Sequence, residues 1–138
     1  MTEPARSTSG LLDTSVFIAR GTGRPLGELP DRVAVSVVTL GELELGVLSA
    51  TDPALRSRRA RTLATARAAD PLPVTESVMA AWARLVADCR HAGVHRTVKL
   101  TDALIAATAV DQGLPVVTQD RDFEEMARAH SDLDVWLV

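Results

Sequence analysis

The chain alternates between short apolar runs and longer stretches in which apolar residues recur at helical spacing. The short runs predict strands at 10–13, 33–36, 115–118 and 134–138, with a brief extended segment at 71–74. The longer stretches predict helices at 14–18, 37–48, 53–69, 75–93, 101–113 and 121–130. Strands that alternate with helices imply parallel crossovers. The expected fold class is therefore α/β, a three-layer α/β/α sandwich with a central, mainly parallel sheet.

Residues at the predicted helix ends carry capping signals. Thr14 or Ser15 is expected to cap the first helix and Thr101 the fifth, because a hydroxyl can accept a hydrogen bond from a free backbone N–H. Asp52-Pro53 combines a cap with the proline that is favoured in a first turn. Gly113 is expected to end the fifth helix, because glycine readily adopts the left-handed backbone conformation that is common just after a helix. These residues mark the expected boundaries of the helices.

The composition is typical of a folded domain, because apolar residues make up 46% of the 138-residue chain and charged residues 24%. We expect one domain over 10–138, preceded by a flexible polar leader over 1–9. The single cysteine, Cys89, excludes an internal disulfide and favours a reducing cytoplasm. No apolar run reaches the roughly 18 residues of a membrane span, and the N-terminus lacks a signal-peptide pattern. Membrane attachment and export by a signal peptide are therefore not expected.

Charge is distributed unevenly along the chain. The net charge of −3 by itself argues against a nucleic-acid partner, since phosphate binding usually leaves a basic footprint. However, no acid lies between Asp52 and Asp70, and this stretch contains a block of arginines: Arg56, Arg58, Arg59, Arg61 and Arg67. An acidic block follows at 120–125. One region could therefore bind phosphates while another binds cations, although the arginines could also form a solvated helix face.

Two acids that are far apart in the sequence follow predicted strands. Asp13 ends the strand at 10–13, and Asp120 lies just beyond 115–118. Parallel strands share one carboxyl edge, where ligands bind, so we expect the two side chains to meet there. Converging negative charges cost free energy unless a proton or a cation neutralises them. Magnesium prefers carboxylate oxygens and is the expected cation, whereas zinc would require Cys or His at ligand spacing.

Each acid also has a structural explanation. Asp13 could cap a helix, and Asp102 could interact with the dipole of the helix whose first turn it occupies. Asp120 and Asp122 could be ordinary turn residues. An acid inside the apolar stretch 37–48 is harder to explain, because acids are rarely buried without a partner. That stretch holds both Glu42 and Glu44, each with apolar neighbours at helical spacing, so the pattern does not choose between them.

Four segments together resemble the ordered motifs of the PIN-domain nucleases. They contain the sequences LDTSV, TLGELELG, TDALIAA and TQDRDF, at 12–16, 39–46, 101–107 and 118–123. Their spacing extends the resemblance over nearly the whole chain after residue 10. Within this superfamily, the chain length and the Glu-Leu-x-x-Gly pattern most resemble the VapC toxins. The resemblance implies that Glu42, which begins that pattern, is functional and that Glu44 is not.

The resemblance also implies the composition of the active site. Asp13, Glu42, Asp102 and Asp120 match the acidic quartet of the family, and Asp122 matches an additional acid. The direct metal ligands would be Asp13 and Asp102. Asp120 would be a further metal-binding residue and, with Glu42, would orient a second ion or a water. Hydroxyls of Thr14 or Thr118 would support the carboxylates.

The implied function is that of a Mg²⁺-dependent endoribonuclease toxin, with Mn²⁺ able to substitute, that hydrolyses RNA by metal-assisted attack of water. The implied partners are an RNA substrate, a VapB-type antitoxin and a second copy of the chain. Operator DNA would be bound only through the antitoxin.

Three other classes of protein are alternatives to a nuclease. A receiver domain needs a lysine after its phosphorylated strand, but Lys99 is the only lysine. A phosphatase with an acid nucleophile would need Asp-x-Asp where this chain has Asp13-Thr14-Ser15. The serious alternative is a catalytically inactive PIN domain that serves as an RNA or protein binding module.

Overall fold

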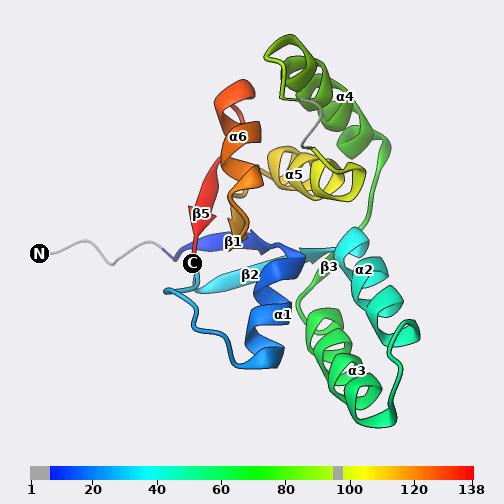
Figure 1. Ribbon diagram of the computed structural model, residues 1–138. Helices are drawn as coiled ribbons and strands as arrows, with labels where there is room; N and C mark the ends of the chain where they lie inside the picture. Colours follow the sequence, from blue (N-terminus) through cyan, green and yellow to red (C-terminus); the bar gives the residue numbers. More distant parts are fainter. Residues whose placement is uncertain (1–6, 95–97) are drawn as a thin grey trace, which may run out of the picture.

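The computed structural model describes residues 7–94 and 98–138. At its centre lies a five-stranded sheet in which every pair of neighbouring strands is parallel (Figure 1). The strand order is β3-β2-β1-β4-β5. The strands are β1 (Ser9–Leu12), β2 (Arg32–Ser36), β3 (Pro71–Leu72), β4 (Val116–Thr118) and β5 (Val135–Leu137).

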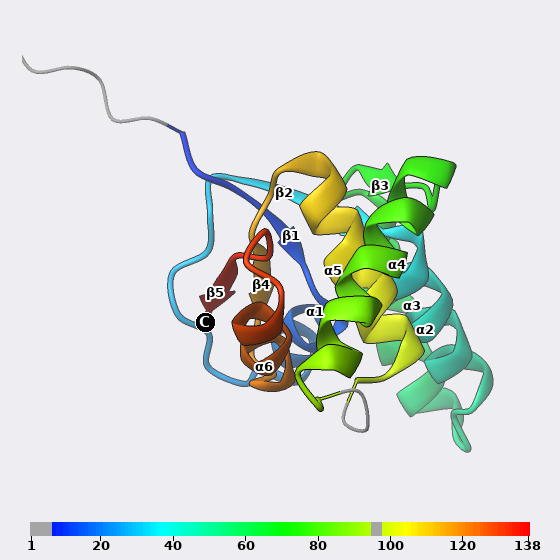
Figure 2. The ribbon, with the colours of Figure 1, turned by 90° about the horizontal axis from the view of Figure 1, so that it is seen from above.

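The described residues form six helices, which cover both faces of the sheet (Figures 1 and 2). One face carries α1 (Thr14–Thr22), α2 (Val37–Leu48) and α3 (Pro53–Arg67). The other carries α4 (Glu76–His91), α5 (Leu100–Gln112) and α6 (Asp122–Ala129). The expected three-layer α/β/α sandwich with a parallel sheet is confirmed.

The central strands contribute side chains to two separate cores. In β1, Leu11 packs with residues of α4, α5 and α6, whereas Leu12 packs with residues of α1, α2 and α3. In β4, Val116 belongs to the same core as Leu11, and Val117 belongs to the same core as Leu12. Successive strand residues point to opposite faces, so a strand covered on both sides must be apolar at every position. This is why the sequence shows these strands as continuous apolar runs.

Two of the predicted helix caps are wrong. Asp13 occupies the N-cap position of α1 and accepts a hydrogen bond from the backbone N–H of Ser15, with an N···O distance of 3.4 Å. The hydroxyl of Thr14 instead donates to Glu42 of α2, and that of Ser15 donates to Asp13, directly after β1. At α5 the cap position is held by Lys99, without a side-chain cap bond, and Thr101 lies inside the helix.

Other predicted boundaries are confirmed. The Asp52 carboxylate accepts from the backbone N–H of Leu55 at 2.8 Å, so it caps α3 as expected. Gly113 ends α5 with a φ of 66°, in the left-handed region that glycine adopts without strain.

The leader expected at 1–9 lies largely outside the described residues. Of its last residues, Thr8 exchanges two hydrogen bonds with Asp31 and Ser9 begins β1. Among the described residues, no helix is both long enough and apolar enough to cross a membrane.

Gly10 allows β1 to lie close to its neighbours. A Cβ atom at this position would lie 2.5 Å from Val117 Cγ2 and 3.1 Å from Pro30 Cγ. Gly10→Ala is therefore expected to destabilise the fold by about 1–3 kcal/mol, the usual cost of overpacking. Urea unfolding measures this change. Gly41→Ala is the matched control, because its Cβ would meet nothing within 4 Å and α2 should gain up to about 1 kcal/mol. Equal unfolding midpoints for Gly10→Ala and the wild type would contradict this packing.

Candidate active site

The adjacent carboxyl ends of β1 and β4 bring Asp13 and Thr118 together. Asp13 directly follows β1 and is only 3% exposed. Its Oδ2 accepts hydrogen bonds from Thr118 Oγ1 and Ser15 Oγ, each at 2.8 Å. Because both hydroxyls donate to the same oxygen, the carboxylate is fixed in orientation. The structure thus places Asp13 at the sheet edge where the sequence predicted it.

The same two hydroxyls hold the segment that follows β4. Thr118 Oγ1 accepts from the backbone N–H of Asp120 at 2.8 Å, and Ser15 Oγ accepts from that of Gln119 at 3.1 Å. Asp120 Oδ1 in turn accepts from the backbone N–H of Asp122 at 2.9 Å. The turn that carries both acids is thereby connected to Asp13 through a continuous set of hydrogen bonds.

Asp102 joins this edge from the first turn of α5 and is 8% exposed. One carboxylate oxygen from each of Asp102, Asp120 and Asp122 lies within 4.8 Å of the other two. The predicted ligand set was Asp13, Asp102 and Asp120. The structure instead groups Asp122 with Asp102 and Asp120 at this spacing, while direct ligation by Asp13 stays a prediction.

The electrostatics of the site disfavour its ionised state. Burial, followed by the charges of Asp13, Asp120 and Glu42, raises the pKa of Asp102 from 3.8 to about 6, although Lys99 opposes the shift. Burial also raises the pKa of Asp13, against the hydrogen bonds from its hydroxyl and backbone partners. These acids therefore lie close enough to repel one another, which a bound cation would relieve.

Glu42 and Glu44 have different surroundings on α2. Glu42 Oε1 accepts a hydrogen bond from Thr14 Oγ1 at 2.7 Å, and Thr14 Oγ1 lies 3.1 Å from Thr39 Oγ1. Since the Thr14 proton is used by Glu42, Thr39 must be the donor to Thr14. Glu44 instead forms an ion pair with Arg67 at 3.2 Å, with both side chains substantially exposed. The structure therefore directs Glu42, and not Glu44, toward the other acids.

Sequence reasoning misses two of these hydroxyl partners. It names Thr14 and Thr118 as supports, and both do donate to carboxylates. It assigns Ser15 only to a helix cap and gives Thr39 no role. The role of Thr39 could have been predicted, because Thr39 precedes Glu42 by three residues on a helix and therefore lies on the same helix face. The role of Ser15 depends on contacts with residues about a hundred positions away, which no local pattern shows.

The raised pKa of Asp102 predicts a pH dependence of stability. Above pH 6 the ionised carboxylate opposes folding, and this penalty declines as the pH falls from about 6 toward the unfolded value of 3.8. Relative to Asp102→Asn, the metal-free wild type should therefore gain unfolding free energy between pH 7 and pH 4. Parallel urea titrations of the two proteins isolate this contribution, because the other acids are common to both. If the difference in unfolding free energy between the two proteins stays constant from pH 7 to pH 4, the pKa of Asp102 is not raised.

The donors of the site suit a hard divalent cation. All three clustered side chains offer carboxylate oxygens, the ligand type that Mg²⁺ and Mn²⁺ prefer over the nitrogen and sulfur ligands typical of zinc. The convergence of anionic oxygens and the raised pKa of Asp102 both fit such an ion.

Comparisons with known proteins show the family of the chain. Residues 10–129 match the PIN domain family. Ribonuclease VapC8 of Mycobacterium tuberculosis is 70% identical over 100 residues, which cover 72% of this chain and 89% of VapC8. Ribonuclease VapC5 of the same organism is 46% identical over 125 residues, which cover 89% of this chain and 91% of VapC5.

Solved structures share the fold. The structure of VapBC-5 from M. tuberculosis, a member of the VapBC family of toxin-antitoxin systems, aligns with a TM-score of 0.80 at 41% identity, covering 95% of this chain and 98% of that chain. FitAcB from Neisseria gonorrhoeae aligns with a TM-score of 0.68 at 27% identity, covering 91% and 95%. DNA-bound VapBC from Salmonella typhimurium has a TM-score of 0.76 at 20% identity, covering 94% and 98%, and supports the fold alone. The chain belongs to the PIN-domain family and, within it, to the VapC ribonucleases of toxin-antitoxin systems.

Proposed function

We propose that this VapC-type ribonuclease, acting in the cytoplasm as a single domain over 10–138, hydrolyses RNA phosphodiester bonds endonucleolytically with Mg²⁺, for which Mn²⁺ can substitute. The observation that carries the proposal is the grouping of Asp102, Asp120 and Asp122 within 4.8 Å, beside the buried Asp13. The 70% identity to ribonuclease VapC8 supports the class of reaction.

The carboxylates divide into metal-holding and water-orienting groups. Asp102, Asp120 and Asp122 would hold the cation, and Asp13 would contribute Oδ1, the oxygen that its hydroxyl partners leave available. When bound, the cation supplies Lewis-acid stabilisation of the phosphate and lowers the pKa of water. Glu42, fixed by Thr14 through Oε1, would orient the attacking water and accept its proton at Oε2.

The proposed partners follow from the assemblies that similar proteins form. The similar VapBC-5 structure, at 41% identity, is described as a member of the VapBC family of toxin-antitoxin systems. We therefore propose a VapB-type antitoxin as partner. Operator DNA bound only through the antitoxin, and a homodimer of the toxin chain, are proposed from the family resemblance.

Cleavage of an RNA pool tests the function directly. The purified chain should produce discrete fragments with Mg²⁺ or Mn²⁺ and none with EDTA, and Asp13→Asn should lose this activity. The Gly41→Ala variant, which leaves every carboxylate in place, serves as a folded control. If the wild type binds RNA but leaves it intact under all these conditions, the alternative of a catalytically inactive binding module is correct.

A further inference from the structure

Two arginines of the block on α3 form hydrogen bonds to the backbone at the end of α2. Arg56 Nη2 donates to the backbone carbonyl of Ala50 at 3.1 Å, and Arg59 Nη1 donates to that of Gly46 at 2.7 Å. These two guanidinium groups thus satisfy carbonyls at the end of α2 and just beyond it, where helical partners run out. They hold α2 and α3 together, so their presence in the block has a structural explanation.

The remaining arginines of the block differ from one another. Arg67 forms the ion pair with Glu44. Arg58 and Arg61 are exposed and, among residues 7–94 and 98–138, have neither an ion pair nor a side-chain hydrogen bond. Arg20, exposed near the end of α1, is likewise unpaired in the described part of the chain. We refer to Arg20, Arg58 and Arg61 as the arginine track.

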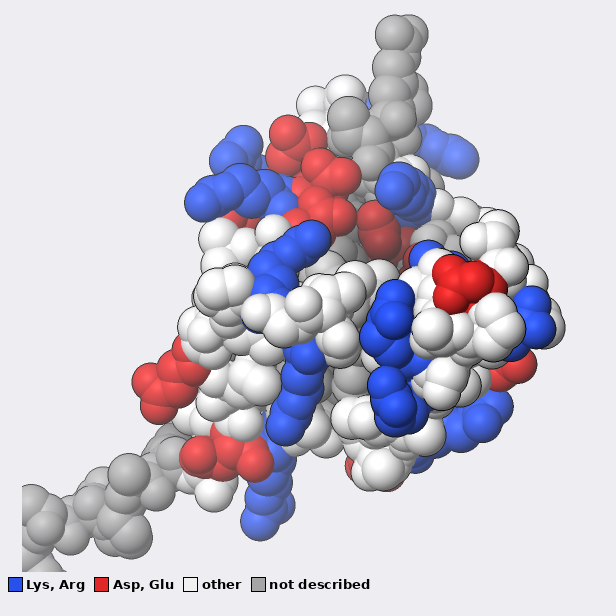
Figure 3. Space-filling view, turned by 60° about the horizontal axis from the view of Figure 1, so that its bottom comes forward, with Lys and Arg blue, Asp and Glu red and all other residues white. Residues whose placement is uncertain are grey.

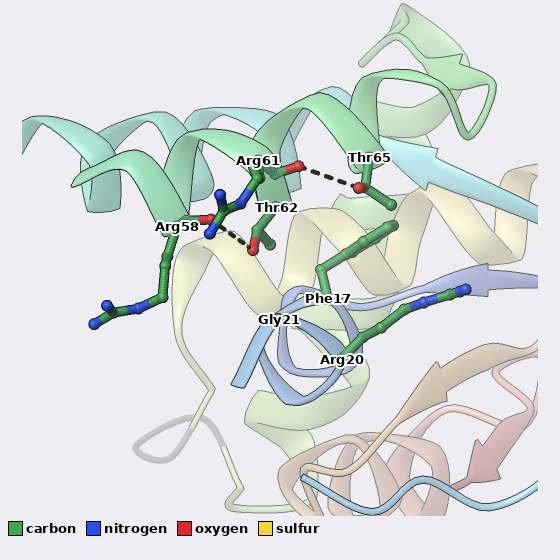
Figure 4. Close-up of a pocket in the computed structure, with 7 residues that line it drawn as sticks. All are labelled: Phe17, Arg20, Gly21, Arg58, Arg61, Thr62 and Thr65. Carbon is green, nitrogen blue, oxygen red and sulfur yellow. Dashed lines mark hydrogen bonds between the residues drawn. The ribbon is translucent and has the colours of Figure 1, made fainter. Parts of the chain in front are cut away.

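The arginine track surrounds a cleft of about 190 Å³ between α1 and α3 (Figure 4). Among the described residues none of those that line it is acidic; they are Phe17, Arg20, Gly21, Arg58, Arg61, Thr62 and Thr65. The hydroxyls of Thr62 and Thr65 donate to backbone carbonyls of α3, as the dashed lines show, so the guanidinium groups are the available donors. Figure 4 shows Arg58 and Arg20 extending in different directions, an arrangement suited to several successive anions and not to one.

The cleft adjoins a second one that reaches Glu42 of the candidate active site. A second, larger cleft of about 570 Å³ shares Gly21, Arg58 and Thr62 with the first and has Glu42 in its wall. Glu42 belongs to the group of acids that raises the pKa of Asp102. The two clefts thus share a wall, and the second extends from the arginine track to Glu42. Basic and acidic side chains lie on the face shown in Figure 3.

We propose that the arginine track binds backbone phosphates of the RNA substrate on one side of the scissile bond; this inference rests on the proposed ribonuclease function. Guanidinium groups bind phosphate oxygens in a bidentate manner, and such contacts position a nucleic acid without reading its sequence. Because the rest of the site is acidic, the track supplies the attraction that an RNA strand needs in order to approach the carboxylates. Substrates that end at the scissile bond on that side would bind poorly.

Salt-dependent binding tests the arginine track. A fluorescein-labelled single-stranded RNA is titrated with the full-length chain in EDTA, so that no cleavage occurs, and Kd is measured by anisotropy at several NaCl concentrations. Each lost phosphate contact should reduce the slope of log Kd against log salt by about 0.7. The triple variant Arg20→Gln, Arg58→Gln, Arg61→Gln should thus lose about 2 in slope and bind at least about tenfold more weakly at low salt.

The matched control is Arg84→Gln, an exposed arginine on α4, the helix layer that covers the opposite face of the sheet. Arg84→Gln should leave both Kd and the slope of log Kd against log salt unchanged. This control distinguishes the loss of direct phosphate contacts from a general effect of lower positive charge. With Mg²⁺, the triple variant should raise KM and preserve kcat. If it retains the wild-type slope, or instead weakens only binding of the antitoxin protein, the track is not an RNA site. If the wild type fails to cleave RNA at all, the proposed function fails, whatever the slope.

Discussion

Asp102→Asn is expected to stabilise the metal-free chain and at the same time to remove its ribonuclease activity. Asp102 is buried beside three other acids, and its pKa of about 6 means that the ionised form, which predominates at pH 7.5, lowers the stability of the fold. Asparagine keeps the shape and removes the charge. The melting temperature in EDTA at pH 7.5 should therefore rise by about 4 °C, the change that roughly 1 kcal/mol produces in a chain of this size.

Activity should respond in the opposite direction, with kcat falling by about 10²–10³, as occurs when one preorganised charged group is removed. The two measurements together separate a functional acid from a structural one, since a structural carboxylate would be stabilising and its loss would lower the melting temperature. A destabilised Asp102→Asn variant would contradict the repulsion inferred for the cluster. Asp132→Asn is the control for removal of one negative charge, because Asp132 is exposed and its carboxylate has no hydrogen bond or ion pair among the described residues.

Glu42→Gln should lower cleavage by about 10²-fold or more, the range of general acid–base effects, whereas Glu44→Gln should leave the rate within about twofold of wild type. Both glutamates lie on α2 and both changes remove one charge, so the pair is internally matched. Glu42 is bonded to Thr14 and interacts electrostatically with Asp102, while Glu44 is paired with Arg67.

Initial rates of cleavage of one labelled RNA at saturating Mg²⁺ give the comparison. Loss of the exposed Glu44 pair should cost little stability, because surface ion pairs contribute about 1 kcal/mol or less. Equal losses in the two variants would show that Glu42 has no special role, and a larger loss in Glu44→Gln would reverse the assignment.

The fold and two of the acids could be predicted from local sequence patterns. Apolar runs identified the strands because β1 and β4 are buried on both faces, and the parallel arrangement then placed Asp13 and Asp120 at one edge. These inferences use only strand position and the general geometry of parallel sheets.

The remaining features depend on contacts between distant segments. Glu42 and Glu44 have equivalent apolar neighbours along α2, and only the position of α1 and α3 beside that helix distinguishes them. Local preference favours Thr14 and Ser15 as caps of α1, but the folded chain uses their hydroxyls on carboxylates, and Asp13 takes the cap position. Asp13 is itself one of the capping candidates in the sequence. The contacts of Thr14 with Glu42 and of Ser15 with Gln119, which help to decide among the three candidates, join segments that no local pattern connects.

Divalent-cation binding to the isolated chain tests the metal site at the strand ends most directly. Isothermal titration with Mn²⁺, and with Mg²⁺ in parallel, should show binding to the wild type at pH 7.5 that weakens below pH 6, because protons compete for Asp102. Asp102→Asn should abolish binding and Glu44→Gln should preserve it. If Asp102→Asn binds the cation with wild-type affinity, the carboxylates at the strand ends are not the metal site, and a metal-dependent mechanism centred on them is wrong.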